Sequence, residues 1–98
     1  MRYTGGVGVF YTYILLCHDG RHYYGSTSDL SQRLRQHREG LVRSTKWRLP
    51  VQLVYFECQQ TLAQARRRER ALENGYTRRK TIDLLIASFP PEKLAPFA

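Results

Sequence analysis

Residues 9–37 read VFYTYILLCHDGRHYYGSTSDLSQRLRQH, and the order of residue types in this stretch decides the fold. The segment from Val9 to Leu16 is rich in β-branched and aromatic residues, which favours a strand. Asp19-Gly20 is a strong turn signal, and Arg21 to Gly25 predicts a second, shorter strand. The chain therefore begins with a β-hairpin over residues 9–25.

A helix follows the hairpin. Competent N-cap residues come first, at Thr27, Ser28 and Asp29. Residues that suit one buried face then recur at helical spacing, at Leu30, Leu34, His37 and Leu41. The pattern predicts a helix from about Asp29 to Arg38 that Glu39-Gly40 closes.

The remainder of the chain predicts one more strand and two more helices. Val51 to Glu57 has the composition of a strand. Thr61 and Gln64 form a capping box that starts a helix ending near Asn74-Gly75, and Thr77 caps the last helix.

The element order β-β-α-β-α-α is that of an α+β protein, with a three-stranded, mainly antiparallel sheet flanked by helices. A chain of 98 residues is the size of one domain. We expect that domain to span residues 1–98, with its core in about 9–86 and with residues 1–8 and 90–98 peripheral.

Composition limits the classes of function. The sequence has 16 Lys and Arg against 8 Asp and Glu, a formal net charge of +8, and a pI of about 10.0. Its hydrophobic content of 42% is too high for a disordered basic tail, and no apolar run approaches a membrane span of roughly 20 residues. Two cysteines cannot build a disulfide scaffold or a four-ligand zinc site. We expect a folded cytoplasmic protein whose partner is a polyanion and not a membrane.

The positive charge gathers in two blocks, residues 33–48 and 64–80, each with a net charge of +5. Arginine outnumbers lysine in both blocks, which suits forked contacts with phosphate. We expect these blocks to contact nucleic acid, with a solvated surface that keeps the protein soluble as the plain alternative. The candidate nucleic-acid-binding residues are Arg35, Arg38, Arg43, Lys46, Arg48, Arg66, Arg68, Arg78, Arg79 and Lys80.

One carboxylate falls on the apolar stripe of the helix that Thr61 starts. Glu69 comes seven residues after Leu62 and shares its side of the helix with Ala65 and Leu72. Burying a carboxylate is costly unless it is paired or binds a cation. The pattern leaves two interpretations open, a salt bridge to a neighbouring arginine and a metal ligand.

His37 is the second polar residue on an apolar stripe, and Arg33 lies one turn before it on the same side. A pair at this spacing can point two donors at one phosphate. The alternative is a packed histidine beside an arginine whose stem lies along the apolar surface.

Together these residues resemble the GIY-YIG nuclease superfamily. Thr12-Tyr13 stands at the end of the first signature, with Tyr11 where the name has glycine, and Tyr23-Tyr24-Gly25 stands in for the second signature. The segment from Ser26 to His37 matches the first helix of the family. The segments from Trp47 to Tyr55 and from Ala65 to Glu69 fit the remainder, so the resemblance covers residues 9–86.

The resemblance implies a divalent-metal-dependent endonuclease that hydrolyses phosphodiester bonds in DNA. Glu69 would be the sole protein ligand of Mg²⁺ or Mn²⁺, and Arg33 would stabilise charge on the scissile phosphate. Of the signature tyrosines, Tyr13 and Tyr23, one would help to deprotonate the attacking water and one would position phosphate or water. His37 would assist proton transfer or phosphate binding.

The small size of the domain leaves no room for a separate reader of sequence. We therefore expect structure-directed or weakly specific cutting, of the kind used in DNA repair or recombination, by a monomer or weak dimer. Candidate substrates are branched, nicked or single-stranded DNA. The main alternative is a non-catalytic nucleic-acid-binding module that keeps the nuclease fold, and a further one is a basic adaptor for an acidic protein.

The loop of the hairpin decides whether Tyr23 can belong to the site. With a two-residue turn, Tyr24 would share the face of Tyr13. With a three-residue loop over 18–20, Leu15 pairs with Tyr23, and Tyr13 and Tyr23 share one face. The nuclease hypothesis requires the three-residue loop or an equivalent bulge.

Overall fold

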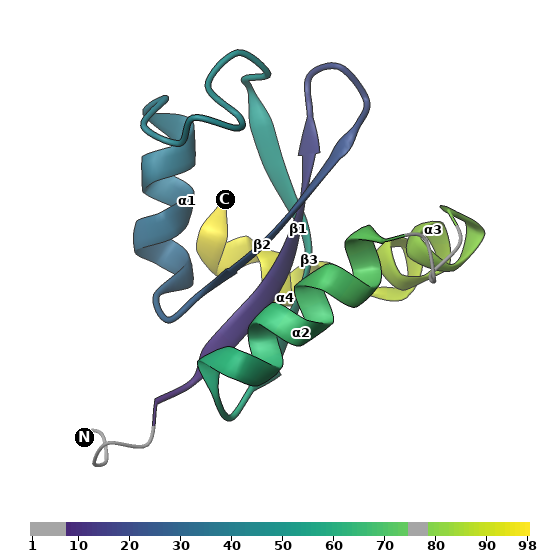
Figure 1. The fold of residues 1–98 in the computed structure, drawn as a ribbon. Helices are drawn as coiled ribbons and strands as arrows, with labels where there is room; N and C mark the ends of the chain where they lie inside the picture. The colour runs from purple at the N-terminus through teal and green to yellow at the C-terminus, as the bar shows by residue number, and fades with distance from the viewer. Residues whose placement is uncertain (1–7, 75–78) are drawn as a thin grey trace.

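The computed structural model describes residues 8–74 and 79–98, and Figure 1 shows its ribbon. Its three strands are β1 (Phe10–Cys17), β2 (His22–Thr27) and β3 (Val51–Gln59). The strand order is β2-β1-β3, and β1 pairs antiparallel with both neighbours. The predicted three-stranded antiparallel sheet is therefore confirmed.

The strands and the first three helices occur in the predicted order β-β-α-β-α-α. The helices are α1 (Leu30–Arg38), between β2 and β3, and α2 (Leu62–Glu73) and α3 (Arg79–Ser88), after β3. Asp29 is the N-cap of α1, because its side chain accepts a hydrogen bond from the backbone N–H of Gln32. The capping box between Thr61 and Gln64 starts α2 as predicted. The expected cap at Thr77 lies outside the described residues. None of the helices within the described residues is long and apolar enough to cross a membrane.

The C-terminal residues differ from the expectation that 90–98 is peripheral. They form a short helix, α4 (Pro91–Leu94), and a 3₁₀ turn, η1 (Ala95–Phe97). Leu94 and Phe97 pack against the core, and the Phe97 ring lies 5.5 Å from that of Phe56 in β3. The Pro90-Pro91 pair ends α3 but also begins α4, because proline is accommodated in the first turn of a helix.

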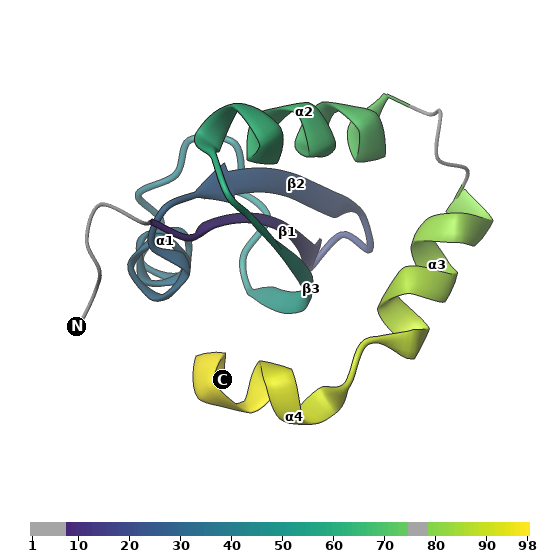
Figure 2. The same cartoon turned by 90° about the horizontal axis from the view of Figure 1, so that it is seen from below.

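The core has two halves, one on each face of the sheet (Figure 2). Helix α1 covers one face, where its leucines pack against Tyr13 and Leu15 of β1. Helices α2 and α3 cover the other, where Leu72 and Ile82 pack against Ile14 and Val54. Alternate residues of β1 thus point into different halves, as the two-residue period of a strand requires.

The hairpin has the three-residue loop. The backbone N–H of Gly20 donates to the carbonyl of Cys17 at 2.9 Å, and Gly20 has a φ of +83° that glycine adopts without strain. Leu15 consequently pairs with Tyr23 in the ladder. Tyr13 and Tyr23 therefore lie on the same face of the sheet, the one that α1 covers.

Gly25 lies directly opposite Tyr13 in the ladder, and the Tyr13 ring lies over it. A Cβ atom at residue 25 would lie 2.5 Å from the Tyr13 hydroxyl oxygen and closer still to its Cζ. The ring is fully buried and its hydroxyl is hydrogen-bonded, so it has no free space to move aside. The final glycine of the second signature is therefore a steric requirement.

We expect Gly25→Ala to lower the free energy of unfolding by about 1–3 kcal/mol, because the added methyl group overpacks the core against Tyr13. Urea unfolding followed by circular dichroism measures this change. In a Tyr13→Leu background the clash is absent, so there the same substitution should be neutral or stabilising. Equal destabilisation in both backgrounds would contradict the steric explanation.

Candidate active site

Tyr13 is the centre of the candidate site. It lies in the middle strand, is fully buried (0% exposed), and its hydroxyl is 2.9 Å from Nε2 of His37. Burial is the largest cause that raises the pKa of Tyr13 above its ordinary value, and Tyr23 and Glu69 add to this effect. The guanidinium of Arg33 acts against them and lowers the pKa. Tyr13 is therefore a neutral phenol, with the other four predicted site residues close enough to contact it or to shift its pKa.

His37 projects from α1 onto Tyr13 and is also fully buried (0% exposed). Its Nδ1 is 2.8 Å from Oγ1 of Thr45, so both ring nitrogens have a hydrogen-bond partner. Burial lowers the pKa of His37 to about 4, with a smaller contribution from the charge of Arg33. His37 is thus a packed, neutral histidine whose ring joins α1 to the sheet and to Thr45.

Tyr23 completes an aromatic cluster with these two residues. Its ring centroid lies 5.0 Å from that of His37 and 6.2 Å from that of Tyr13. The Tyr23 side chain is half-buried, in contrast to Tyr13. The structure thus brings both signature tyrosines together around one imidazole.

Arg33 lies one turn before His37 on α1, with its side chain half-buried. Its Nη1 donates to Oε1 of Gln36 at 2.9 Å. It also lowers the pKa values of both Tyr13 and His37. Arg33 is therefore the positive charge of the candidate site, although Arg33 and His37 do not present two free donors side by side, because both nitrogens of His37 have partners.

Glu69 reaches the site from α2, on the other face of the sheet. Its Oε1 accepts a hydrogen bond of 2.8 Å from Oγ of Ser26 in β2, and the carboxylate is half-buried. The strand β2 lies at the edge of the sheet. Tyr13 lies on the face that α1 covers, with its ring over Gly25 of β2, and Glu69 reaches β2 from the opposite face. Glu69 is close enough for its charge to raise the pKa of Tyr13.

The salt-bridge interpretation of Glu69 does not hold within the described part of the chain. Two ion pairs are present there, Arg48 with Asp19 and Arg68 with Glu57. Glu69 takes part in neither pair, and its partner is the Ser26 hydroxyl. What keeps this carboxylate at the edge of a core is therefore a hydrogen bond from an uncharged hydroxyl group.

The donor set around Glu69 limits which cation it suits. Residues 8–74 and 79–98 contain no group of three or more His, Cys, Asp or Glu side chains that could hold a metal ion. A tetrahedral zinc site needs at least three such ligands. A hard cation such as Mg²⁺ binds through one or two carboxylates and retains several waters, so the single carboxylate of Glu69 fits it.

The predicted nucleic-acid-binding residues fall into three groups. Arg48 and Arg68 are engaged in ion pairs with Asp19 and Glu57. The side chains of Arg78 and Arg79 lie outside the described part. The remaining predicted residues have exposed side chains, namely Arg35, Arg38, Arg43, Lys46, Arg66 and Lys80. Of these, Arg38 also donates to the backbone carbonyl of Phe97.

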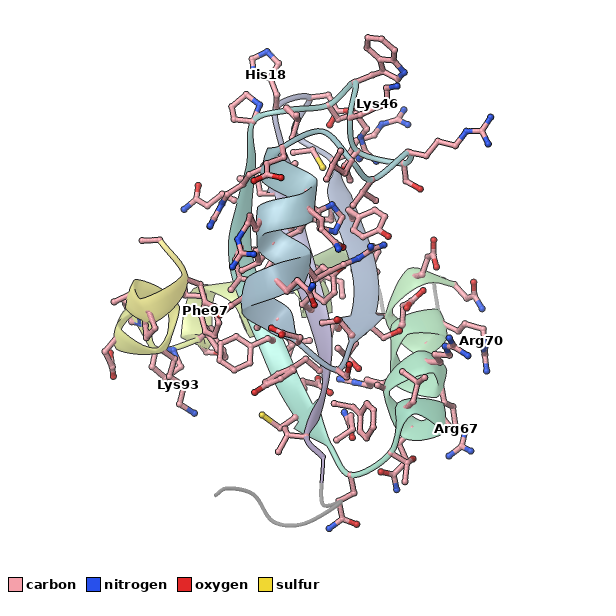
Figure 3. The ribbon with its side chains drawn as sticks, turned by 90° about the vertical axis from the view of Figure 1, so that its left-hand side faces the viewer. His18, Lys46, Arg67, Arg70, Lys93 and Phe97 are labelled. Carbon is pink, nitrogen blue, oxygen red and sulfur yellow. The ribbon has the colours of Figure 1, made fainter. Side chains whose placement is uncertain are left out.

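Helix α2 presents different chemistry on its two sides. Arg68 forms two hydrogen bonds of 3.0 Å from its Nε to the Glu57 carboxylate in β3, whereas Glu69 faces Ser26 in β2. Figure 3 shows Arg67 and Arg70 extending outward from the same helix. The arginine-rich block of the sequence is therefore divided between an ion pair on the β3 side and an exposed outer surface.

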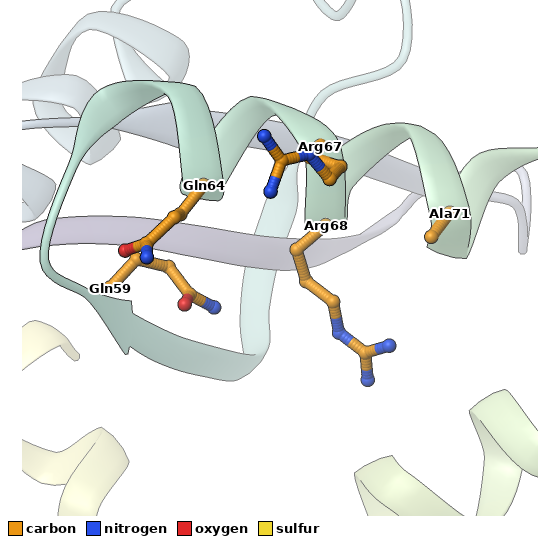
Figure 4. A pocket seen from close by; sticks show the side chains of 5 residues that line it. All are labelled: Gln59, Gln64, Arg67, Arg68 and Ala71. Atoms are coloured by element: carbon orange, nitrogen blue, oxygen red, sulfur yellow. The ribbon is translucent and has the colours of Figure 1, made fainter.

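A pocket of about 320 Å³ lies on the β3 side of α2 (Figure 4). Its lining residues are Gln59, Gln64, Arg67, Arg68 and Ala71. It contains none of the candidate catalytic residues, which gather at the β2 edge. This pocket is therefore separate from the candidate site.

Sequence reasoning missed two residues that hold the site together, Ser26 and Thr45. Ser26 alternates with Tyr24 on the α2 face of β2, so the two-residue period was a usable signal for it. Thr45 lies in the segment between α1 and β3, where no periodicity indicates which side chain turns inward.

Sequence comparison matches most of the chain to known proteins. The family model described as the GIY-YIG catalytic domain matches residues 9–83. A UPF0213 protein of Haloquadratum walsbyi is 44% identical over 71 residues, covering 71% of this chain and 79% of the relative. A UPF0213 protein of Bacillus pumilus is 41% identical over 86 residues, covering 87% of this chain and 86% of the relative.

The fold also matches a solved structure. The solution NMR structure of a UPF0213 protein from Bacillus halodurans aligns with a TM-score of 0.52 and 31% identity, covering 89% of this chain and 93% of that one. With three-quarters of its length matched by the family model and both signature tyrosines on one face of the sheet, the chain belongs to the GIY-YIG family.

Proposed function

We propose that this protein is a divalent-metal-dependent endonuclease that hydrolyses phosphodiester bonds in DNA. One observation carries the proposal. The buried hydroxyl of Tyr13 is hydrogen-bonded to a neutral histidine, and an arginine and a carboxylate both lie close enough to shift its pKa. These are a proton acceptor, a phosphate-binding cation and a metal ligand around one phenol.

The first step of the proposed reaction is proton transfer through Tyr13. The guanidinium of Arg33 lowers the pKa of Tyr13, and Nε2 of His37 lies 2.9 Å from its hydroxyl, so in this proposal the phenol would direct its proton to His37. His37 then donates from Nδ1 to Oγ1 of Thr45. In the proposed reaction Tyr13 would take a proton from the attacking water as it passes its own proton to His37, which requires the bound substrate to bring that water to a hydroxyl that is fully buried in the free protein.

Burial makes this relay preferable to a free phenolate. A phenol with a raised pKa is almost never ionised at neutral pH, so Tyr13 alone would be a poor base. A neutral imidazole within hydrogen-bonding distance can take the phenol proton during the step itself. Because the pKa of His37 is about 4 in the free protein, the proposal requires the bound phosphate to stabilise the protonated imidazole. Tyr23 is not the proton carrier in this proposal, because its ring makes an edge-to-face contact with the ring of His37. Its half-buried position suits it to orient phosphate or water.

Arg33 and Glu69 would act on the phosphate itself. The forked guanidinium matches the geometry of phosphate oxygens and offsets the charge that develops during displacement. Glu69 would hold Mg²⁺ or Mn²⁺, with Ser26 orienting its carboxylate through Oε1. The bound ion would serve as a Lewis acid that stabilises the leaving oxygen.

Substrate binding in this proposal depends on the backbone and shape of DNA. The exposed basic side chains of the two blocks contact phosphates, which carry no sequence information. Cutting would thus be structure-directed or weakly specific, which would suit a role in DNA repair or recombination.

Glu69→Gln should reduce Mg²⁺-dependent cleavage of a panel of linear, nicked, flapped and branched DNA by at least about 100-fold, because the amide is a much weaker metal ligand. Thermal unfolding should change little, since the amide oxygen can still accept from Ser26. The matched control is Glu73→Gln, which removes the same charge from an exposed position of α2.

Two outcomes would overturn the proposal. Cleavage by Glu69→Gln at the rate of the unsubstituted protein would remove the metal-ligand role. Tight, salt-dependent DNA binding without turnover on any substrate would favour the non-catalytic binding module.

The buried histidine gives a pH prediction. The folded protein protonates His37 near pH 4, whereas the unfolded chain does so near pH 6.5, so the folded state loses stability as the pH falls between these values. The free energy of unfolding relative to a His37→Gln variant should therefore shrink across this window. Urea titrations at several pH values measure it, and a constant difference from pH 6.5 to 4 would contradict a neutral His37.

A further inference from the structure

Trp47 leaves almost all of its large apolar surface in contact with water, which is energetically unfavourable. It is the one tryptophan of the sequence, and its side chain is 86% exposed, more than the exposed large apolar residues elsewhere in the described part. A single exposed aliphatic residue needs no explanation, but a nearly bare indole sacrifices the largest apolar contact that a side chain can make.

The segment that carries Trp47 is firmly anchored on both sides. Two residues earlier, Thr45 is fully buried and bonded to His37. One residue later, the carbonyl of Arg48 accepts from the backbone N–H of His18 at 3.0 Å, and its Nε donates to Asp19 at 3.1 Å. The backbone N–H of Arg48 also bonds the carbonyl of Thr45 at 2.8 Å, which closes a turn around Trp47. The indole is therefore held out on a rigid turn.

The surroundings of the indole are positively charged. Lys46 places its ammonium 4.9 Å from the centre of the ring, a cation–π contact that covers one face. Arg43 is exposed nearby in the sequence, and no acidic residue occurs between Gly40 and Pro50. A ligand that matches this surface is anionic and offers a flat aromatic face, which is the chemistry of a nucleotide.

The turn also lies next to the candidate active site. Two peptide units separate the Cα atoms of Trp47 and Thr45, a distance of at most roughly 7.6 Å, and Thr45 touches His37. Figure 3 shows Lys46 and His18 at the same end of the molecule, beyond the C-terminal end of α1. A strand whose phosphate reaches Tyr13 would thus present a neighbouring nucleotide to Trp47.

We propose that Trp47 is a stacking site for an unpaired base of a DNA strand bound at the candidate active site. This inference rests on the proposed function in taking DNA as the ligand. Bases inside a duplex have both faces covered by their neighbours, so only a single strand, a gap, a flap or a frayed end offers a free face to the indole. The proposal narrows the substrate to DNA with an unpaired nucleotide beside the scissile phosphate.

A membrane surface is the competing partner, because tryptophan and lysine together also suit lipid headgroups. The surroundings favour DNA, since the immediate neighbours of Trp47 are Lys46 and Arg48, and the one other exposed apolar side chain described in this segment, Leu41, is a single residue and not a face that would enter a bilayer. The link through Thr45 to the site of proposed phosphodiester cleavage favours DNA as well.

The test measures binding without divalent metal, in the presence of a chelator, so that cleavage plays no part. Anisotropy of a labelled oligothymidine strand and of a blunt duplex of equal length gives affinities at one fixed salt concentration. Trp47→Ala should weaken binding of the single strand by roughly 5- to 150-fold, while affinity for the duplex changes less than about 2-fold. The affinity of Trp47→Phe for the single strand should lie between that of Trp47→Ala and that of the unsubstituted protein.

Intrinsic fluorescence gives a second measurement that needs no substitution. Because Trp47 is the one tryptophan, its emission should be quenched by the single strand and not by the duplex. The control variant is Leu84→Ala, which removes an exposed apolar side chain (62% exposed) from α3 and should leave both affinities unchanged.

Three results would overturn the inference. They are equal affinity of Trp47→Ala and the unsubstituted protein for the single strand, equal loss for both DNA forms, and an emission change with anionic phospholipid vesicles but not with DNA. Trp47-dependent strand binding without cleavage in magnesium would instead remove the proposed function and leave this inference standing. DNA cleavage in magnesium, combined with single-strand binding that does not depend on Trp47, would support the proposed function and remove this inference.

Discussion

The hydrogen bond between the Tyr13 hydroxyl and His37 is the contact on which the rest of the molecule depends. It joins the central strand to the helix that covers one face of the sheet, in the middle of a core of leucine side chains. Two buried polar groups in that environment are tolerated only because each satisfies the other. The glycine opposite Tyr13, the three-residue hairpin loop and the buried Thr45 all serve to keep this pair in place.

Helix α2 solves a related problem for a strongly basic segment. A helix with four arginines in five positions has to lie against a sheet without bringing unpaired charge into the core. Arg68 turns toward β3 and is neutralised by Glu57, while Glu69 turns toward β2 and meets a serine hydroxyl. The positive charge of Arg68 is thereby paired, and the Glu69 carboxylate is held at the β2 edge by the serine hydroxyl.

The fold could be predicted from the sequence because its signals are local. The turn residues, the capping residues and the period of apolar side chains each act over a few positions, and the strands and helices appear close to where these signals put them. The gathering of Tyr13, Tyr23, Arg33, His37 and Glu69 was predicted only through resemblance to a family. Both tyrosines share a face because the hairpin loop has three residues and not two. The positive φ of Gly20 allows this loop.

Three features could not be predicted, each for a physical reason. Thr45 bonds to His37 from an irregular segment, where no period links sequence to direction. The two-residue period of β2 places Ser26 on the α2 face, but its pairing with Glu69 depends on how close α2 lies to β2, which is a tertiary property. The C-terminal residues, expected to be peripheral, pack on the core through Leu94 and Phe97, and such a contact between the end of the chain and the sheet is a tertiary property that no local signal records.

The full burial of Tyr13 and His37 has a consequence for how such a domain can evolve. In many enzymes the reactive side chains lie in a cleft and burden the fold, so replacing them raises stability at the expense of activity. Here the same two side chains fill the core and carry the proposed chemistry, so selection for a stable domain also preserves its reactive groups. A descendant that lost its activity would retain this pair for structural reasons alone, and the pair by itself is therefore a poor marker of which relatives remain active.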